Sequence, residues 1–128
     1  MITPGSKDLR GAFIALVRDW FTLLSQGEVE AAAAMIDAEN SYGVRWGAQE
    51  IQAALREYSR DGETPKVTNP SSVAGEGRSD FGAFDDGGGY WLDYAVPLDG
   101  EWSDLTAQFE FHVQGDRFAF VLHDMHVL

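Results

Sequence analysis

The last part of the chain alternates apolar and polar residues with the period of two that is typical of half-buried β-strands. Two short turn sequences, Asp99-Gly100 and Gly115-Asp116, interrupt this alternation. Asp-Gly suits a type I′ hairpin turn and Gly-X suits a type II′ turn, because each supplies positive φ where the turn needs it. The pattern therefore predicts three consecutive strands, at Tyr90–Leu98, Glu101–Gln114 and Arg117–Leu128.

Turns of two residues also predict which residues face one another across the strands, because they leave no freedom in the register. All the paired side chains are expected on one face of the sheet, which is apolar except at the end that carries Asp124 and His126. Phe109 is expected to be buried between Tyr90 and Leu122. The predicted pairs are Tyr94–Leu105, Leu92–Ala107 and Tyr90–Phe109 in the first hairpin, and Phe111–Phe120, Phe109–Leu122, Ala107–Asp124 and Leu105–His126 in the second.

The first part of the chain shows helical spacing instead. One apolar stripe predicts a first helix of about four turns, with Ser6 as its N-cap and Gly27 as its C-terminal stop. A second helix is expected to follow at once, because Glu28 and Glu30 are favourable in a first turn. The residues of the first stripe are Leu9, Phe13, Leu16, Val17, Trp20 and Leu24, and those of the second helix expected in the core are Val29, Ala33 and Ile36.

The middle of the chain predicts shorter elements. Ser41–Trp46 is expected to be a small strand, and a third helix is expected at Ala48–Ser59, ended by Asp61-Gly62 and Pro65. Lys66–Asn69 is expected to open the sheet. From Pro70 to Gly89 the residues Gly, Ser and Asp dominate, which predicts one irregular strand and a mobile turn before Tyr90.

Helices followed by antiparallel strands predict an α+β fold, in which N-terminal helices pack on one face of a curved, mainly antiparallel sheet. A curved sheet wrapped on a long amphipathic helix forms a cone, and we expect a pocket inside it. No internal repeat or second domain is evident, so residues 1–128 are expected to form a single domain.

Composition and charge exclude several kinds of function. The chain contains no cysteine, which excludes disulfides, thiolate metal sites and cysteine nucleophiles. Its formal net charge is −12, so its surface is expected to repel nucleic acid and anionic membranes. The same acidity would attract a basic protein partner.

The chain shows no membrane or export signal. No run of ~18 apolar residues predicts a membrane-spanning helix. The segment from Met1 to Asp8 lacks the cationic start and apolar stretch of a signal peptide. We therefore expect a cytoplasmic protein that binds neither nucleic acid nor membrane.

Three stretches of sequence and the order of the elements resemble the NTF2-like superfamily, which includes ketosteroid-isomerase-like and polyketide-cyclase-like proteins. The resemblance implies a single NTF2-like cone, also described as a cystatin-like roll, with frequent homodimers and a pocket inside the cone. Members include enzymes, ligand binders, transport adaptors and immunity proteins against toxins, so the fold does not decide the function. The stretches are residues 24–32 at the helix junction, residues 46–51 before the third helix, and Trp102-Ser103-Asp104 together with the terminal hairpin.

The same resemblance argues against steroid isomerase chemistry. Ketosteroid isomerases carry a carboxylate base near the short strand after the second helix and a tyrosine on the first helix. Residues 41–46 of this chain contain no carboxylate, and the first helix has Trp20 and Phe21 instead of a tyrosine.

Asp124 and His126 form the candidate catalytic site. They lie two residues apart on one strand, so their side chains leave the same face, and the predicted register brings Tyr94 near them. An aspartate that orients a histidine beside a tyrosine hydroxyl is suited to general acid–base catalysis. The alternative interpretation is a half-solvated pair at the open end of the sheet, without a catalytic role.

An apolar wall on the same face is the candidate ligand-binding surface. It would hold the body of a small apolar molecule, while the polar end would orient it. The wall consists of Tyr90, Leu92, Phe109, Phe111, Phe120 and Leu122. The opposite, outer face is expected to form a homodimer interface centred on Trp91, His123 and Met125, with a sheet face open to water as the alternative.

No cofactor or metal site is predicted, because the spacing of the three histidines and of the acidic residues matches no metal-binding motif. Three functions remain open. The first is binding of a small apolar molecule inside the cone. The second is a cofactor-free isomerase, cyclase or dehydratase that uses Asp124 and His126, and the third is an acidic protein-binding module such as a toxin immunity protein.

Overall fold

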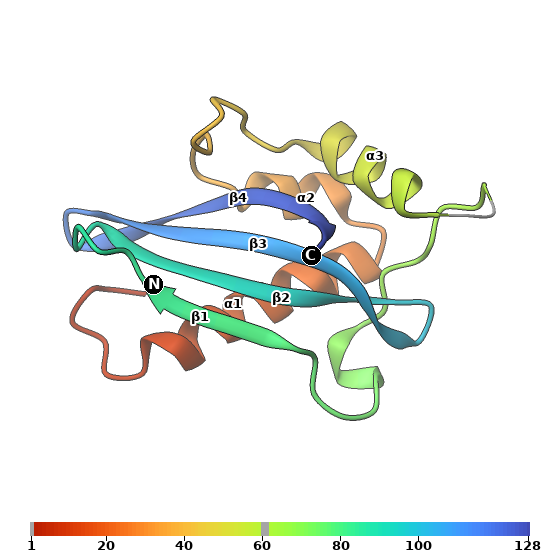
Figure 1. The fold of residues 1–128 in the computed structure, drawn as a ribbon, viewed down its shortest axis with the longest axis horizontal. Coiled ribbons are helices and arrows are strands. Elements are labelled where there is room, and N and C mark those ends of the chain that lie inside the picture. Colours follow the sequence, from red (N-terminus) through yellow and green to blue (C-terminus); the bar gives the residue numbers. More distant parts are fainter. Residues whose placement is uncertain (1, 60–61) are drawn as a thin grey trace.

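The computed structural model describes residues 2–59 and 62–128, and its helices cover one face of a four-stranded antiparallel sheet (Figure 1). The strands follow one another in the order β1-β2-β3-β4, so the predicted α+β class is confirmed. The elements are α1 (Leu9–Ser25), α2 (Val29–Ala34), α3 (Ala48–Tyr58), the 3₁₀ turn η1 (Pro70–Ser72), β1 (Ser79–Ala83), β2 (Gly89–Leu98), β3 (Glu101–Gln114) and β4 (Arg117–Val127).

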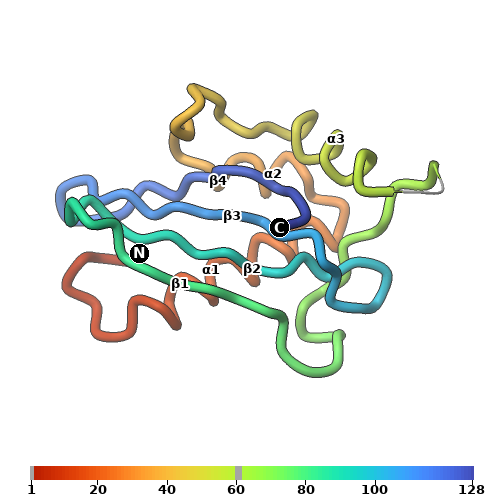
Figure 2. Tube along the Cα trace, viewed as in Figure 1, coloured from red at the N-terminus to blue at the C-terminus, as the bar shows by residue number. Residues whose placement is uncertain are grey.

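The turns of the sheet divide between two ends of the molecule. Figure 2 shows the β1–β2 and β3–β4 turns at the same end as the N-terminal segment, and the β2–β3 turn at the opposite end. Asp61, which is expected to help end the third helix, lies outside the described residues.

The first helix begins later than the sequence predicts and ends where predicted. Asp8, not Ser6, is the N-cap, and its Oδ1 accepts a hydrogen bond from the Gly11 N–H at 3.0 Å. Aspartate is as good a cap as serine, and the Ser6 N–H instead donates to the Thr3 carbonyl. At the other end Gly27 has a φ of +76°, and the Glu28 N–H donates to the Leu23 carbonyl at 2.9 Å, which is the Schellman ending.

Aromatic side chains of α1 fill the space between the helix and the inner face of the sheet. Phe13 stacks on Phe111 with ring centroids 3.8 Å apart, and Trp20 meets Phe109 edge-on at 5.3 Å. Both α1 residues are fully buried. The Trp20 Nε1–H also donates to the Ala32 carbonyl at 3.0 Å, which attaches α2 to the same core.

The first hairpin has the predicted turn but not the predicted register. Asp99 and Gly100 have φ values of +50° and +86°, as a type I′ turn requires. An irregularity between Ala95 and Pro97 then shifts the pairing by two residues. An even shift keeps every side chain on its predicted face, but the observed pairs are Tyr94–Ala107, Leu92–Phe109 and Tyr90–Phe111.

The second hairpin follows the predicted register only as far as Leu122. Phe111 pairs with Phe120 and Phe109 with Leu122, as predicted. A bulge then inserts one extra residue, His123, so that Gln108 pairs with Asp124 and Ala107 with Met125. A shift of one residue exchanges the two faces.

The bulge overturns three sequence-based placements at once. Asp124 and His126 were expected on the inner face, but they pair with Gln108 and Thr106 and therefore lie on the outer face. Met125 was expected on the outer face, but it is 6% exposed and belongs to the core.

Two short strands expected in the middle of the chain are absent from the described structure. Residues 41–46 form a turn and an extended loop, because the Asn40 Oδ1 accepts hydrogen bonds from the N–H groups of Tyr42 and Val44. The same Asn40 donates to the backbone of β4 through Nδ2, so this segment covers the free edge of the sheet. Residues 66–69 contribute one isolated bridge, Val67 with Leu98, instead of a strand.

Replacement of Phe109 by alanine tests the central position of this side chain in the core. Phe109 is 1% exposed and lies between Leu92 and Leu122, so we expect F109A to lower the free energy of unfolding by about 3–5 kcal/mol. Urea denaturation followed by circular dichroism measures this loss. A loss below about 1 kcal/mol, which is usual for surface positions, would contradict the assignment.

Candidate functional site

The outer face of the sheet, turned away from α1, gathers all three histidines of the chain among carboxylates. The bulge at His123 is responsible, because it turns Asp124 and His126 outward to join residues of the neighbouring strands. The other residues of this surface point outward because side chains alternate between the two faces along each strand. We call this surface the histidine–carboxylate face, and it consists of Asp80, Trp91, Asp93, Gln108, Glu110, His112, His123, Asp124 and His126.

Of the three predicted catalytic residues, the structure brings two together. The His126 Nδ1 lies 3.0 Å from the Asp124 Oδ2, and the two side chains are 44% and 39% exposed. Tyr94 lies on the inner face, is 4% exposed, and accepts a hydrogen bond from the Arg18 Nη1 at 3.3 Å. Tyr94 therefore cannot act with the pair, because the sheet separates them.

The pair also has a different neighbourhood from the one expected. Asp124 borders an open hollow of about 470 Å³ between β4, α3 and the loop at residues 40–46, whose lining includes Tyr42, Trp46 and His123. A catalytic role for Asp124 and His126 at this place stays a prediction.

Glu110 is the centre of the histidine–carboxylate face. Its Oε1 lies 2.9 Å from the His112 Nε2, and its Oε2 lies 3.7 Å from the His123 Nδ1. That Nδ1 is buried and has no hydrogen-bond partner among the described residues. Aromatic rings flank both histidines, since Phe84 stacks on His112 and Tyr42 stacks on His123.

A shallow hollow of about 290 Å³ lies beside Glu110, and Trp91 and Asp93 help to line it. A Cβ added to Gly82 would stand 2.6 Å from the Trp91 ring, so the indole lies directly over this glycine of β1. Burial, the largest cause, and the nearby charge of Asp80 raise the pKa of Asp93, while hydrogen bonding from Gln108 acts in the opposite direction.

The raised pKa of Asp93 predicts how the stability of the folded chain depends on pH. The folded chain holds the Asp93 proton more tightly than the unfolded chain, so this residue penalises folding increasingly as the pH rises through its folded pKa. We expect Asp93→Asn to raise the melting temperature at pH 7, and to have no such effect below the ordinary aspartate pKa of 3.8. Asp85→Asn, at an exposed position, is the control. Thermal denaturation at several pH values measures both, and an equal gain at every pH would contradict the prediction.

The predicted apolar ligand wall is mostly core. Leu92, Phe109 and Leu122 are at most 1% exposed, and the rings of α1 occupy the space in front of the wall. Tyr90 stacks on Phe81 at 5.5 Å. Only Phe111 and Phe120 border a crevice between the helices and the sheet.

This apolar crevice, of about 310 Å³, lies between α1, the end of α2 and the β3–β4 hairpin. Its single charged group is Asp37, whose Oδ2 accepts a hydrogen bond from the Phe120 N–H at 2.8 Å. Phe118 was not among the predicted wall residues, although it alternates with Phe120 and Leu122 along β4. Ile2, Leu16 and Met35 complete the lining, and no local pattern in the sequence places them together.

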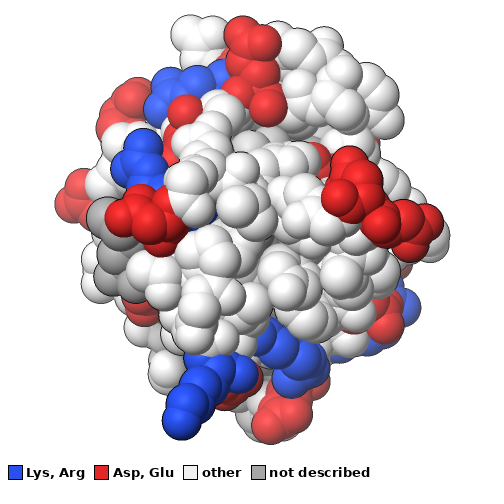
Figure 3. Space-filling view, turned by 90° about the vertical axis from the view of Figure 1, so that its left-hand side faces the viewer, with Lys and Arg blue, Asp and Glu red and all other residues white. Residues whose placement is uncertain are grey.

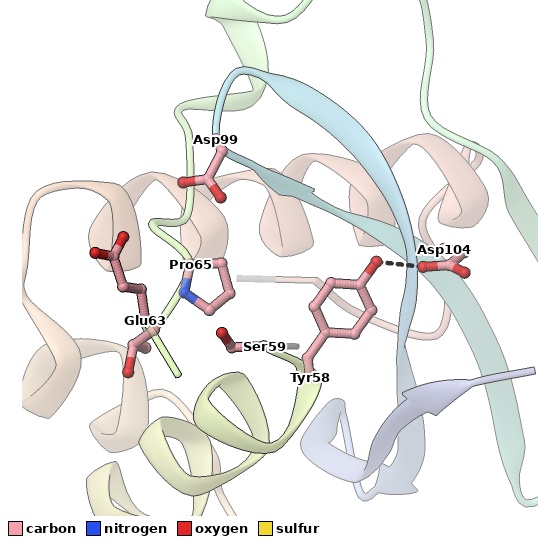
Figure 4. A pocket seen from close by; sticks show the side chains of 7 residues that line it. Tyr58, Ser59, Glu63, Pro65, Asp99 and Asp104 are labelled. Carbon is pink, nitrogen blue, oxygen red and sulfur yellow. Dashed lines mark hydrogen bonds between the residues drawn. The ribbon is translucent and has the colours of Figure 1, made fainter. Parts of the chain in front are cut away.

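A third hollow, of about 460 Å³, opens where α3 ends (Figure 4). The Tyr58 hydroxyl points toward Asp104 and donates a hydrogen bond to it, whereas Glu63 lies on the far side of Pro65. The hydrogen bond to Asp104, together with burial and the charge of that carboxylate, raises the pKa of Tyr58. The Tyr58 hydroxyl is therefore held in its protonated, hydrogen-bond-donating form. This form suits a link between α3 and β3 better than the role of a catalytic base.

The structure also bears on metals and membranes. Among residues 2–59 and 62–128, no three histidine or acidic side chains are grouped in a way that could hold a metal ion. No helix in the described part of the chain has the length and apolar character needed to cross a membrane.

Comparison with known proteins places the chain in a family without assigning a function. A family described as a domain of unknown function, DUF7668, matches residues 21–128, which is well over half of the chain. No curated protein and no solved structure matches the chain. The protein therefore belongs to the DUF7668 family.

Proposed function

We propose that the protein binds a small apolar molecule in the crevice between its helices and its sheet. The observation that carries the proposal is the lining, which is apolar apart from one carboxylate. Its volume of about 310 Å³ is at the lower end of the ~300–1,000 Å³ of known ligand sites. The lining residues are Ile2, Leu16, Met35, Asp37, Phe111, Phe118 and Phe120.

The surface around this end of the molecule supports the proposal. Figure 3 shows the face at which the β3–β4 turn lies, and its charged side chains gather near the margins while the middle is uncharged. The layer arrangement is also compatible with the NTF2-like cone, whose members often hold a ligand between helices and sheet. Asp37 would orient the ligand, because only its Oδ2 is engaged by the Phe120 N–H.

The experiment uses a neutral apolar probe, N-phenyl-1-naphthylamine, whose fluorescence rises in an apolar site. We expect saturable binding with one site per chain. Leu16→Gln should weaken it at least tenfold, because it places an amide in the lining. Leu23→Gln is the matched control, since Leu23 is also a partly buried residue of α1 that packs on the core, but it does not line the crevice.

Two results would contradict the proposal. One is the absence of saturable fluorescence, and the other is an equal loss of binding in the Leu16 and Leu23 variants. A third variant, Leu16→Trp, tests the same site without introducing a polar group. Its larger ring should fill the crevice and exclude the probe while keeping the surface apolar.

We also propose that the histidine–carboxylate face binds a second copy of the chain. The observations that favour this role are Trp91 beside a hollow and the buried His123 Nδ1, which has no hydrogen-bond partner among the described residues. Met125 takes no part, because it lies in the core.

Sedimentation of Trp91→Glu tests this association. We expect a wild-type dimer at micromolar concentration and a monomeric variant, because the new carboxylate adds charge to an already acidic face. Val113→Glu is the control, since Val113 is an exposed apolar residue of β3 outside this face. A wild-type monomer at micromolar concentration would refute the proposal.

A further inference from the structure

We propose that a separate hollow, on the other side of α1 from the apolar crevice, binds a small organic oxyanion, either a carboxylate or a phosphate ester. The hollow measures about 400 Å³ and lies between α1, η1 and the segment that leads into β1. Two arginines of α1 line it. The complete lining is Arg10, Ile14, Arg18, Pro70, Ser71, Val73, Gly75, Glu76, Gly77, Ser79 and Tyr94.

The two arginines reach the hollow because of their spacing. Arg10, Ile14 and Arg18 follow one another at intervals of four residues, which places them along one side of a helix. The two Cα atoms are ~12 Å apart along the helix axis, and the long side chains can converge from both ends. The Arg10 Nη2 lies 3.4 Å from the Ser79 Oγ, and the Arg18 Nη1 lies 3.3 Å from the Tyr94 Oη.

Neither guanidinium has an acidic partner in the described structure. Within residues 2–59 and 62–128, every ion pair closer than 4.0 Å involves a histidine, so no carboxylate oxygen is that close to Arg10 or Arg18. The chain carries 21 acidic residues and only nine Lys and Arg residues. Two unpaired cations in one hollow of so acidic a protein therefore point to an anion from outside the chain.

The chemistry of the hollow indicates which anion fits. A guanidinium has five N–H donors in a planar fork that matches the oxygens of a carboxylate or a phosphate. In the described structure the Arg18 guanidinium donates only through Nη1, to the neutral hydroxyl of a tyrosine that is 4% exposed. Ile14, Pro70 and Val73 add apolar surface to the same hollow. A small oxyanion with an apolar body therefore suits this hollow better than a free inorganic ion.

Glu76 is the one acidic residue in the lining. Its negative charge opposes the entry of an anion into the hollow. Removal of its charge by Glu76→Gln should therefore tighten anion binding, which is the reverse of the effect expected for a residue that only stabilises the fold.

Isothermal titration of the full chain with sodium benzoate and with phenyl phosphate tests the inference. We expect saturable binding of at least one of them with one site per chain, weakened at least tenfold in Arg10→Gln and in Arg18→Gln. Arg56→Gln is the matched control, because Arg56 is exposed in the last turn of α3 and lies outside the hollow. Tighter binding of benzoate would assign carboxylates as the ligand class, and tighter binding of phenyl phosphate would assign phosphate esters.

The outcomes separate this inference from the proposed apolar site. Leu16→Gln should leave the binding of both anions unchanged, since Leu16 lines only the crevice. The inference is overturned if neither anion binds saturably, or if Arg56→Gln weakens binding as much as Arg10→Gln does. Arg10 is exposed, so its variant keeps the test valid even if Arg18→Gln lowers stability, and melting curves of each variant verify that it is folded.

Discussion

The packing of α1 against the inner face of the sheet is the interaction on which the rest of the structure depends. Phe13 lies flat on Phe111 with centroids 3.8 Å apart, and Trp20 meets Phe109 edge-on. Protein interiors are close-packed, so these rings occupy the middle of the space between the layers. The space between α1 and the sheet is therefore filled at its centre, and the apolar crevice and the arginine-lined hollow lie on either side of α1.

The same helix gives those two hollows different chemistry. Leu16 contributes to the apolar crevice and Ile14 to the arginine-lined hollow. Residues two apart on a helix are separated by about 200° around its axis, so α1 stands between the two sites. An apolar molecule and an organic anion could therefore occupy the protein together without sharing a side chain.

One extra residue in β4 determines the character of the outer face. The bulge at His123 exchanges the faces for the end of the strand, so Met125 enters the core while Asp124 and His126 turn outward. The outer face thereby gains a carboxylate and a histidine, which lie opposite Gln108 and Thr106. Histidines and carboxylates therefore gather on the outer face, whereas the inner face carries mainly apolar side chains.

The sequence by itself determined the order of the helices and of the last three strands, the α+β class, both hairpin turns and the helix stop at Gly27, because each depends on residues close together in the chain. It did not reveal the bulge at His123, since whether an extra residue fits depends on the partner strand and on Asn40, which binds the β4 backbone at that point. The catalytic prediction for Asp124, His126 and Tyr94 depended on that register, so the placement of all three on one face was wrong. The crevice and the arginine-lined hollow were decided only by tertiary structure, because their residues come from segments that meet when the helices pack on the sheet.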